Sequence, residues 1–172
     1  MKRRIVMIIL VLLCFLLQST VMPAISIASI APNCLLILTV SFALMRGKKE
    51  GMFVGFFGGL LIDLFFGNVL GFYTLLYTYV GYVNGFCYHI FYDDDIKMPI
   101  LLIAASNLAC SIITYVFQFL LRGRIDFFFY LKRIIIPEVI YTMILTMLCY
   151  RLLYKLNRKL EKAEQRSVDS FV

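Results

Sequence analysis

The sequence predicts an all-α polytopic membrane protein: one bundle of about six transmembrane helices with almost no soluble domain. Two observations predict this class. Of the 172 residues, 62% are hydrophobic and only 16% are charged, whereas soluble domains contain about 25% charged residues. The charged residues also gather in short clusters separated by long apolar runs. This pattern is typical of segments that cross a hydrocarbon layer.

The apolar runs place the spans in order along the chain. The first follows Lys2, Arg3 and Arg4 and is about 18 residues long, which exceeds the roughly 7–15 residues of a signal-peptide core. We therefore interpret it as an uncleaved span. We expect a transmembrane bundle over residues 1–154 and a cytoplasmic tail over 155–172. The expected spans are about 5–22, 28–45, 51–66, 70–91, 98–121 and 134–154.

The second expected span is ambiguous. Its apolar core, residues 33–45, would form only about 20 Å of helix, against about 30 Å for the hydrocarbon core. Extension toward the amino terminus adds length but includes Pro32. The segment is either a kinked span, a tilted span or a re-entrant segment, and the last case would leave five spans.

Basic residues set the expected orientation. With six spans, both termini lie on one side, and that side holds all but four of the 17 Lys and Arg residues. The positive-inside rule therefore puts both termini in the cytoplasm. The four exceptions on the other side are Arg122, Arg124, Lys132 and Arg133.

The ionisable residues exclude several classes of site. The five cysteines are widely and irregularly spaced and His89 is the single histidine, so no metal-ligand spacing is present. Catalytic groupings such as Ser/His/Asp, HExxH or a phosphate-binding glycine loop are absent as well. We therefore expect no enzyme chemistry, no cofactor and no metal. Because the basic residues flank apolar runs, they indicate topology signals and lipid contacts, and we expect no nucleic acid partner.

Small residues in the third and fourth expected spans favour close helix packing. They recur every four residues, and the series in the third span continues into Asp63. A carboxylate in a span costs about 2.5–3.5 kcal/mol. Asp63 is therefore either a satisfied structural carboxylate near the outer interface or a proton, ligand or partner site. The expected packing or partner-interface residues are Gly51, Gly55, Gly58, Gly59, Asp63, Gly67, Gly81 and Gly85.

Two further groups of candidate residues lie in the fifth and sixth spans. One polar face of the fifth span carries Asn107, Ser111, Thr114 and Gln118. Lipid cannot satisfy such a face, so it lines either the bundle interior or a solute cavity. In the sixth span we expect Arg133, Pro137 and Glu138 to form a helix-start cluster. Proline suits the first turn of a helix, and an acidic residue there faces the positive end of the helix dipole.

One stretch of the third span is distinctive: GFFGGLLIDL at residues 55–64. Around it stand Pro32-Asn33 with the run at residues 35–38, then Arg46, Gly51, Gly67 and Leu70-Gly71; Arg133 with Pro137 gives a looser match. Together with the chain length and the six-segment layout, these residues resemble the MreD family of bacterial rod shape-determining proteins.

The resemblance implies a non-enzymatic, multi-pass scaffold of the bacterial cytoplasmic membrane. Such a scaffold belongs to the rod complex (elongasome), which maintains cell shape and inserts peptidoglycan along the side wall. The implied partners are MreC, most directly, with MreB, RodA and a class B penicillin-binding protein in the same complex, and membrane lipids. Helix packing against the single span of MreC would use the glycine stripe and Asp63. The resemblance also implies a fold similar to the substrate-binding components of ECF-type vitamin transporters.

Two other functions fit parts of the sequence. Asp63 and the polar face of the fifth span also suit the membrane substrate-binding subunit of a small-solute, vitamin-type transporter. A lipid-handling membrane enzyme is the third interpretation, although the chain lacks a convergent set of ionisable residues for it.

Overall fold

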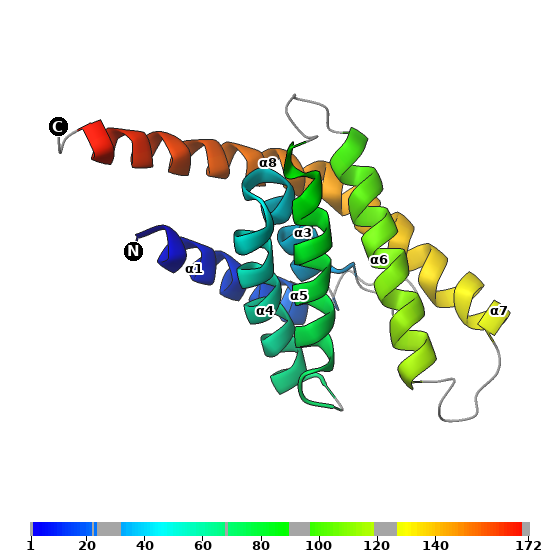
Figure 1. Cartoon of the computed structure of the whole chain (residues 1–172). Helices are drawn as coiled ribbons and strands as arrows, with labels where there is room; N and C mark the ends of the chain where they lie inside the picture. Colours follow the sequence, from blue (N-terminus) through cyan, green and yellow to red (C-terminus); the bar gives the residue numbers. More distant parts are fainter. Residues whose placement is uncertain are drawn as a thin grey trace.

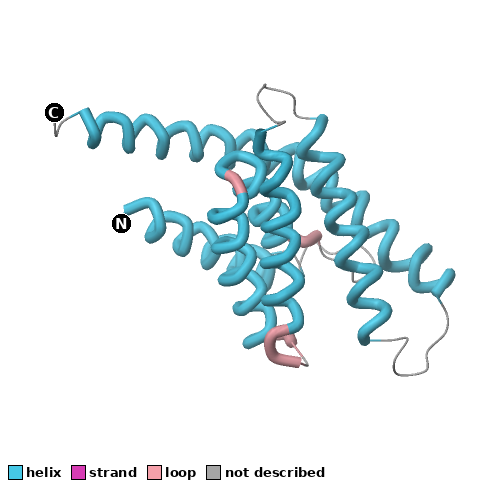
Figure 2. The backbone as a smooth tube through the Cα atoms, viewed as in Figure 1, coloured by secondary structure: helices cyan, strands magenta, loops and turns pink. Residues whose placement is uncertain are grey.

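In the computed structural model of the chain, the apolar runs fold into helices that run back and forth through one bundle (Figures 1 and 2). The structure describes residues 2–21, 23, 32–67, 69–89, 97–118 and 127–169. Every regular element in these ranges is a helix, which confirms the all-α class. The elements are α1 (Lys2–Leu16), η1 (Leu17–Val21), α3 (Cys34–Arg46), α4 (Lys48–Phe65), α5 (Phe72–Asn84), η2 (Gly85–His89), α6 (Lys97–Gln118), α7 (Phe127–Tyr130), η4 (Leu131–Ile135) and α8 (Ile136–Asp169).

Three helical stretches are long and apolar enough to cross a membrane: Arg4–Val21, Lys97–Phe117 and Leu131–Arg158. They correspond to the first, fifth and sixth expected spans. The expected tail remains helical as far as Asp169, because α8 runs on beyond the bundle (Figure 1). Parts of the expected spans and of the tail lie outside the described residues, namely 22, 28–31, 90–91, 119–121 and 170–172.

Helix α3 occupies the centre of the bundle and explains the ambiguous second segment. Every residue from Cys34 to Leu44 is buried, and α1, α4, α5, α6 and α8 all pack against this helix. A helix enclosed by protein need not match the thickness of the lipid core, so 13 residues suffice. Pro32 lies outside the helix, and the side chain of Asn33 caps it by accepting a 3.2 Å hydrogen bond from the Leu36 amide.

Helices α4 and α5 form the closest antiparallel pair, because their small residues face one another. A Cβ atom added at Gly51, Gly55 or Gly59 would come closer than 3.0 Å to the backbone of α5. Gly81 and Gly85 in turn lie against the backbone of α4. Backbone contact at this distance is possible only between residues without side chains at these positions.

The glycine stripe of α4 is therefore used within the chain. We expected it as a packing or partner surface, and α5 fills the groove it makes. A partner helix cannot enter the same groove without displacing α5. Gly58 is different, since its added Cβ would make only an ordinary contact with Leu35 of α3, at 3.5 Å. Gly67 lies against the backbone of Asp63, at the turn that follows α4.

The expected helix start at Pro137 needs a correction. Pro137 and Glu138 do lie in the first turn of α8, but helical structure continues upstream through η4 and α7. The helix therefore has no free amino-terminal dipole at Glu138. The π-helical turn at Leu131–Ile135 precedes the proline, whose missing N–H and bulky ring disrupt regular α-helical bonding. Arg133 is exposed, and its guanidinium lies 5.3 Å from the centre of the Phe129 ring.

A buried polar cluster joins α8 to the turn between α3 and α4. Arg46 Nη1 lies 3.7 Å from Glu50 Oε2, and Arg46 Nε donates a hydrogen bond to Asn157 Oδ1. Gly47 forms the turn itself with φ of +88°, a conformation that side-chain-bearing residues rarely adopt. The cluster ties the last part of the bundle to its central helix.

The glycine contacts predict opposite effects for two neighbouring alanines. Gly55→Ala should force α4 and α5 apart and lower the free energy of unfolding by about 1–3 kcal/mol, as overpacking does. Gly58→Ala should be neutral or stabilising by up to ~1 kcal/mol, because alanine favours helix and has room. Thermal unfolding in detergent, followed by far-UV circular dichroism, measures both. Equal midpoints for the two variants would contradict the α4–α5 assignment.

Candidate functional site

Asp63 is a fully partnered carboxylate that caps α5. Its side chain is 3% exposed and accepts hydrogen bonds from the amides of Gly71 (3.1 Å), Tyr73 (3.0 Å) and Thr74 (2.8 Å). The hydroxyl of Thr74 donates a further bond of 2.5 Å. A negative charge at the amino end of a helix satisfies free amides and complements the helix dipole. The structure therefore favours the structural interpretation of Asp63 over a ligand site.

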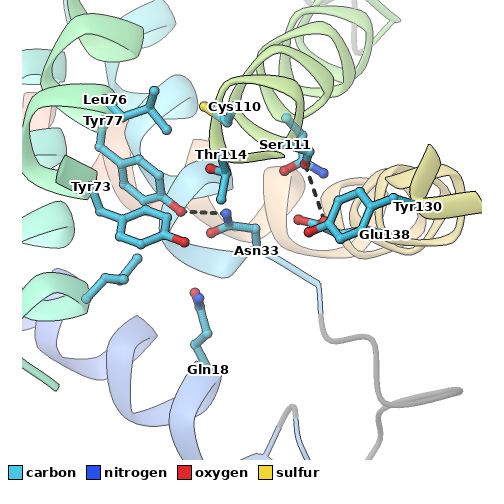
Figure 3. Close-up of a pocket in the computed structure, with 12 residues that line it drawn as sticks. Gln18, Asn33, Tyr73, Leu76, Tyr77, Cys110, Ser111, Thr114, Tyr130 and Glu138 are labelled. Atoms are coloured by element: carbon cyan, nitrogen blue, oxygen red, sulfur yellow. Dashed lines mark hydrogen bonds between the residues drawn. The ribbon is translucent and has the colours of Figure 1, made fainter. Parts of the chain in front are cut away.

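A second polar feature is a cavity of about 240 Å³ between the helices (Figure 3). Its lining comes from η1, the amino ends of α3 and α5, the carboxyl end of α4, the second half of α6, and the start of the α7–α8 run. Since successive helices run in opposite directions, these parts lie in the half of the bundle away from the α3–α4 turn. The lining residues are Gln18, Asn33, Ile62, Tyr73, Leu76, Tyr77, Asn107, Cys110, Ser111, Thr114, Tyr130 and Glu138.

Hydrogen bonds fix several polar side chains of the cavity wall. Asn33 Nδ2 donates to the Tyr77 hydroxyl at 2.5 Å, and Gln18 Oε1 accepts from the Leu35 amide at 3.0 Å. Across the cavity, Ser111 Oγ donates to Glu138 Oε2 at 3.3 Å, which links α6 to α8 (Figure 3). The first two bonds tie the wall to the amino end of α3, and the third ties α6 to α8, so the fold holds these polar groups in place.

The cavity gathers much of the polar face expected on the fifth span. Asn107, Ser111 and Thr114 all border it, whereas the side chain of Gln118 lies outside the described residues. Glu138 also borders the cavity, although we expected it as part of a helix start. The sequence pattern did not single out Gln18 or Asn33 as cavity residues. Their amides within or beside apolar runs were the signal that could have identified them.

The cavity can bind a ligand through hydrogen bonds, aromatic surface and one carboxylate. Glu138 is the acidic residue of the lining, and none of the lining residues is basic. Tyr73, Tyr77 and Tyr130 contribute rings and hydroxyls.

Asn84 does not border the cavity. Its side-chain amide donates a hydrogen bond to Ser106 Oγ at 2.8 Å and so links α5 to α6.

A bundle of apolar helices around an enclosed central helix, with a polar cavity in one half, defines an integral membrane protein. A family model described as "rod shape-determining protein MreD" matches residues 1–160, and the chain therefore belongs to the MreD family. This confirms the resemblance drawn from the motif around residues 55–64 and gives the chain a role in rod shape determination. No curated protein and no solved structure matches the chain.

The hydrogen bonds to Asp63 predict a graded loss of stability. Asp63→Ala leaves the first amides of α5 without their acceptor and should cost about 2–3 kcal/mol of unfolding free energy. Thr74→Val removes only the hydroxyl donor and should cost about 0.5–1.5 kcal/mol. Thermal unfolding compares the two, and amide hydrogen exchange at Tyr73 and Thr74 locates the loss. Equal destabilisation by both variants would argue against the cap.

Proposed function

We propose that the chain is a non-enzymatic scaffold of the rod complex in the bacterial cytoplasmic membrane, supporting side-wall peptidoglycan synthesis. The observation that carries the proposal is the family match over residues 1–160, which covers all of the bundle. The packing supports it too. An enclosed α3 and a backbone-to-backbone α4–α5 pair make a rigid body, and a rigid body can hold several partners at fixed relative positions.

The proposed orientation has both termini in the cytoplasm. Arg46, Lys48 and Lys49 cluster around the α3–α4 turn, and α8 carries further basic residues after Tyr150. Basic residues at one end of a bundle favour the cytoplasmic side and its anionic lipids. On this proposal the extension of α8 lies on the side of the MreB filament, while RodA and the penicillin-binding protein meet the bundle within the membrane.

The proposed direct partner is MreC, whose single span would pack on a lipid-facing surface. Because α5 occupies the glycine groove of α4, the contact surface must lie elsewhere. Exposed apolar residues are available on three helices: Ile9 on α1, Leu75 on α5 and Leu148 on α8. Each stands in an apolar face that lipid or a partner helix can cover.

Depletion of the protein in its host, with MreC levels held constant, tests the proposed function. We expect rods to widen and become spheres, because side-wall insertion loses its scaffold. Cell width measured by microscopy gives the readout. Re-expression of the Gly58→Ala variant should restore the rods, since that substitution leaves the packing intact. Cells that keep their width throughout depletion would contradict the scaffold role.

Site-specific photo-crosslinking locates the MreC contact. A photoreactive residue at Ile9, Leu75 or Leu148 samples three faces, and we expect an MreC adduct from one face and little from the others. The same three positions tested against an unrelated single-span protein provide the control. The absence of MreC adducts at all three, with normal protein levels, would remove these helix faces as the contact surface.

The polar cavity keeps one alternative open, a membrane substrate-binding subunit of a small-solute transporter. Polar groups held at fixed positions in a cavity can orient a bound solute. The depletion experiment distinguishes the two functions. Loss of rod shape with unchanged solute uptake supports the scaffold, whereas loss of uptake with unchanged shape supports the transporter subunit.

A further inference from the structure

The cavity is a built feature of the bundle that the scaffold function does not use. We propose that it binds a primary ammonium group, carried by a small soluble amine or by the head group of an amine-bearing lipid. The carboxylate of Glu138 receives the positive charge, and the tyrosines of the lining supply aromatic surface within the same cavity.

The charges of the lining select a cation. Glu138 is partly buried and accepts a hydrogen bond from Ser111, but none of the twelve lining residues is Lys, Arg or His. Carboxylates inside membrane bundles pair with a charge or with donor groups, because lipid offers neither. An anionic ligand would be repelled by Glu138 and would find no basic residue to bind. A ligand ammonium supplies both the opposite charge and the N–H donors.

The aromatic residues of the lining also favour a cationic ligand. Tyr73, Tyr77 and Tyr130 border the cavity from two helical segments, α5 and α7. The rings of Tyr73 and Tyr77 meet edge to face, with centroids 6.3 Å apart. Ring faces attract cations within about 6 Å of their centres, and the effect grows where water is excluded. A cavity lined by one carboxylate and three tyrosines suits an alkylammonium better than a neutral sugar or an acid.

The size of the cavity limits the ligand. A volume of about 240 Å³ is below the roughly 300–1,000 Å³ of sites for drug-sized molecules. This volume is about eight times that of one water molecule. An ammonium on a short carbon chain fits this space, and the remainder of a larger molecule would extend outside it.

The place of the cavity is consistent with either source of the amine. Its lining belongs to the half of the bundle away from Arg46 and the α3–α4 turn. Under the proposed orientation this is the outer half, which faces extracytoplasmic solutes and the outer leaflet. Soluble amines and lipid head groups both reach this side without crossing the membrane.

The test uses the full chain in detergent and follows thermal unfolding by far-UV circular dichroism with increasing ethanolamine. A ligand that binds the folded state raises the midpoint in proportion to its occupancy. We expect a saturable rise with ethanolamine and none with ethylene glycol, its neutral counterpart. Glu138→Gln should weaken binding by at least about tenfold. Glu50→Gln, the matched change in the buried cluster beyond the cavity, should leave the response intact.

A second pair of probes distinguishes the two sources. Short-chain phosphatidylethanolamine and phosphatidylglycerol with identical acyl chains differ in the ammonium. A response to both ethanolamine and phosphatidylethanolamine indicates that a soluble amine suffices, and a response to the lipid alone indicates a head group. Equal responses to ammonium and neutral probes, or no response to any, would overturn the proposal.

Thr114→Lys provides a variant that does not depend on the folding of Glu138→Gln. Thr114 lines the cavity, and a lysine there supplies an internal ammonium to Glu138. The folded variant should lose its response to ethanolamine and to phosphatidylethanolamine. An undiminished response in this variant, or in Glu138→Gln, would show that the amines bind elsewhere.

Discussion

The enclosure of α3 is the constraint on which the rest of the structure depends. Its residues are buried from Cys34 to Leu44, so five other helices must pack around a core only about 20 Å long. Helix α3 begins at Cys34 and is shorter than most of the helices around it. Side chains from those helices therefore meet beyond its amino end. The cavity lies there, with the helix cap Asn33 in its wall. The short central helix thus accounts for both the common packing surface of the surrounding helices and the polar space in one half of the bundle.

Packing around so short a core demands close approach elsewhere. The α4–α5 pair meets this demand with glycines, which bring the two backbones into direct contact. Asp63 then fixes the register of the pair, because its side chain extends from the last part of α4 and accepts hydrogen bonds from the first amides of α5. Small residues and a capping carboxylate therefore act together: the glycines set the distance between the helices, and Asp63 sets their relative position along the axis.

Hydropathy and spacing predicted a good part of this arrangement, and the residues show why the rest escaped. Long apolar runs predicted the membrane class and the helices, since the backbone N–H and C=O groups of a span must be hydrogen-bonded within the protein. Four-residue spacing predicted that the glycines of the third and fourth spans pack closely, and in the structure α5 fills the groove of α4. The length of residues 33–45 was ambiguous because the sequence does not reveal that protein, not lipid, surrounds them. Pro137 suggested a helix start, but the π-helical turn at Leu131–Ile135 continues the helix upstream of the proline. Gln18 and Asn33 join the cavity through tertiary contacts that span distant parts of the chain.

Two carboxylates inside the bundle illustrate how environment decides between a structural and a binding role. Asp63 receives hydrogen bonds from three backbone amides and a hydroxyl, so its lone pairs are committed to the fold and little capacity remains for a ligand. Glu138 receives a longer hydrogen bond from Ser111 and borders a cavity whose lining holds no basic residue. From sequence, Asp63 attracted more interest because a carboxylate inside a span is costly and needs a partner. The geometry reverses that order: Asp63 is needed to build the bundle, and Glu138 is the group that the built bundle presents to a cation.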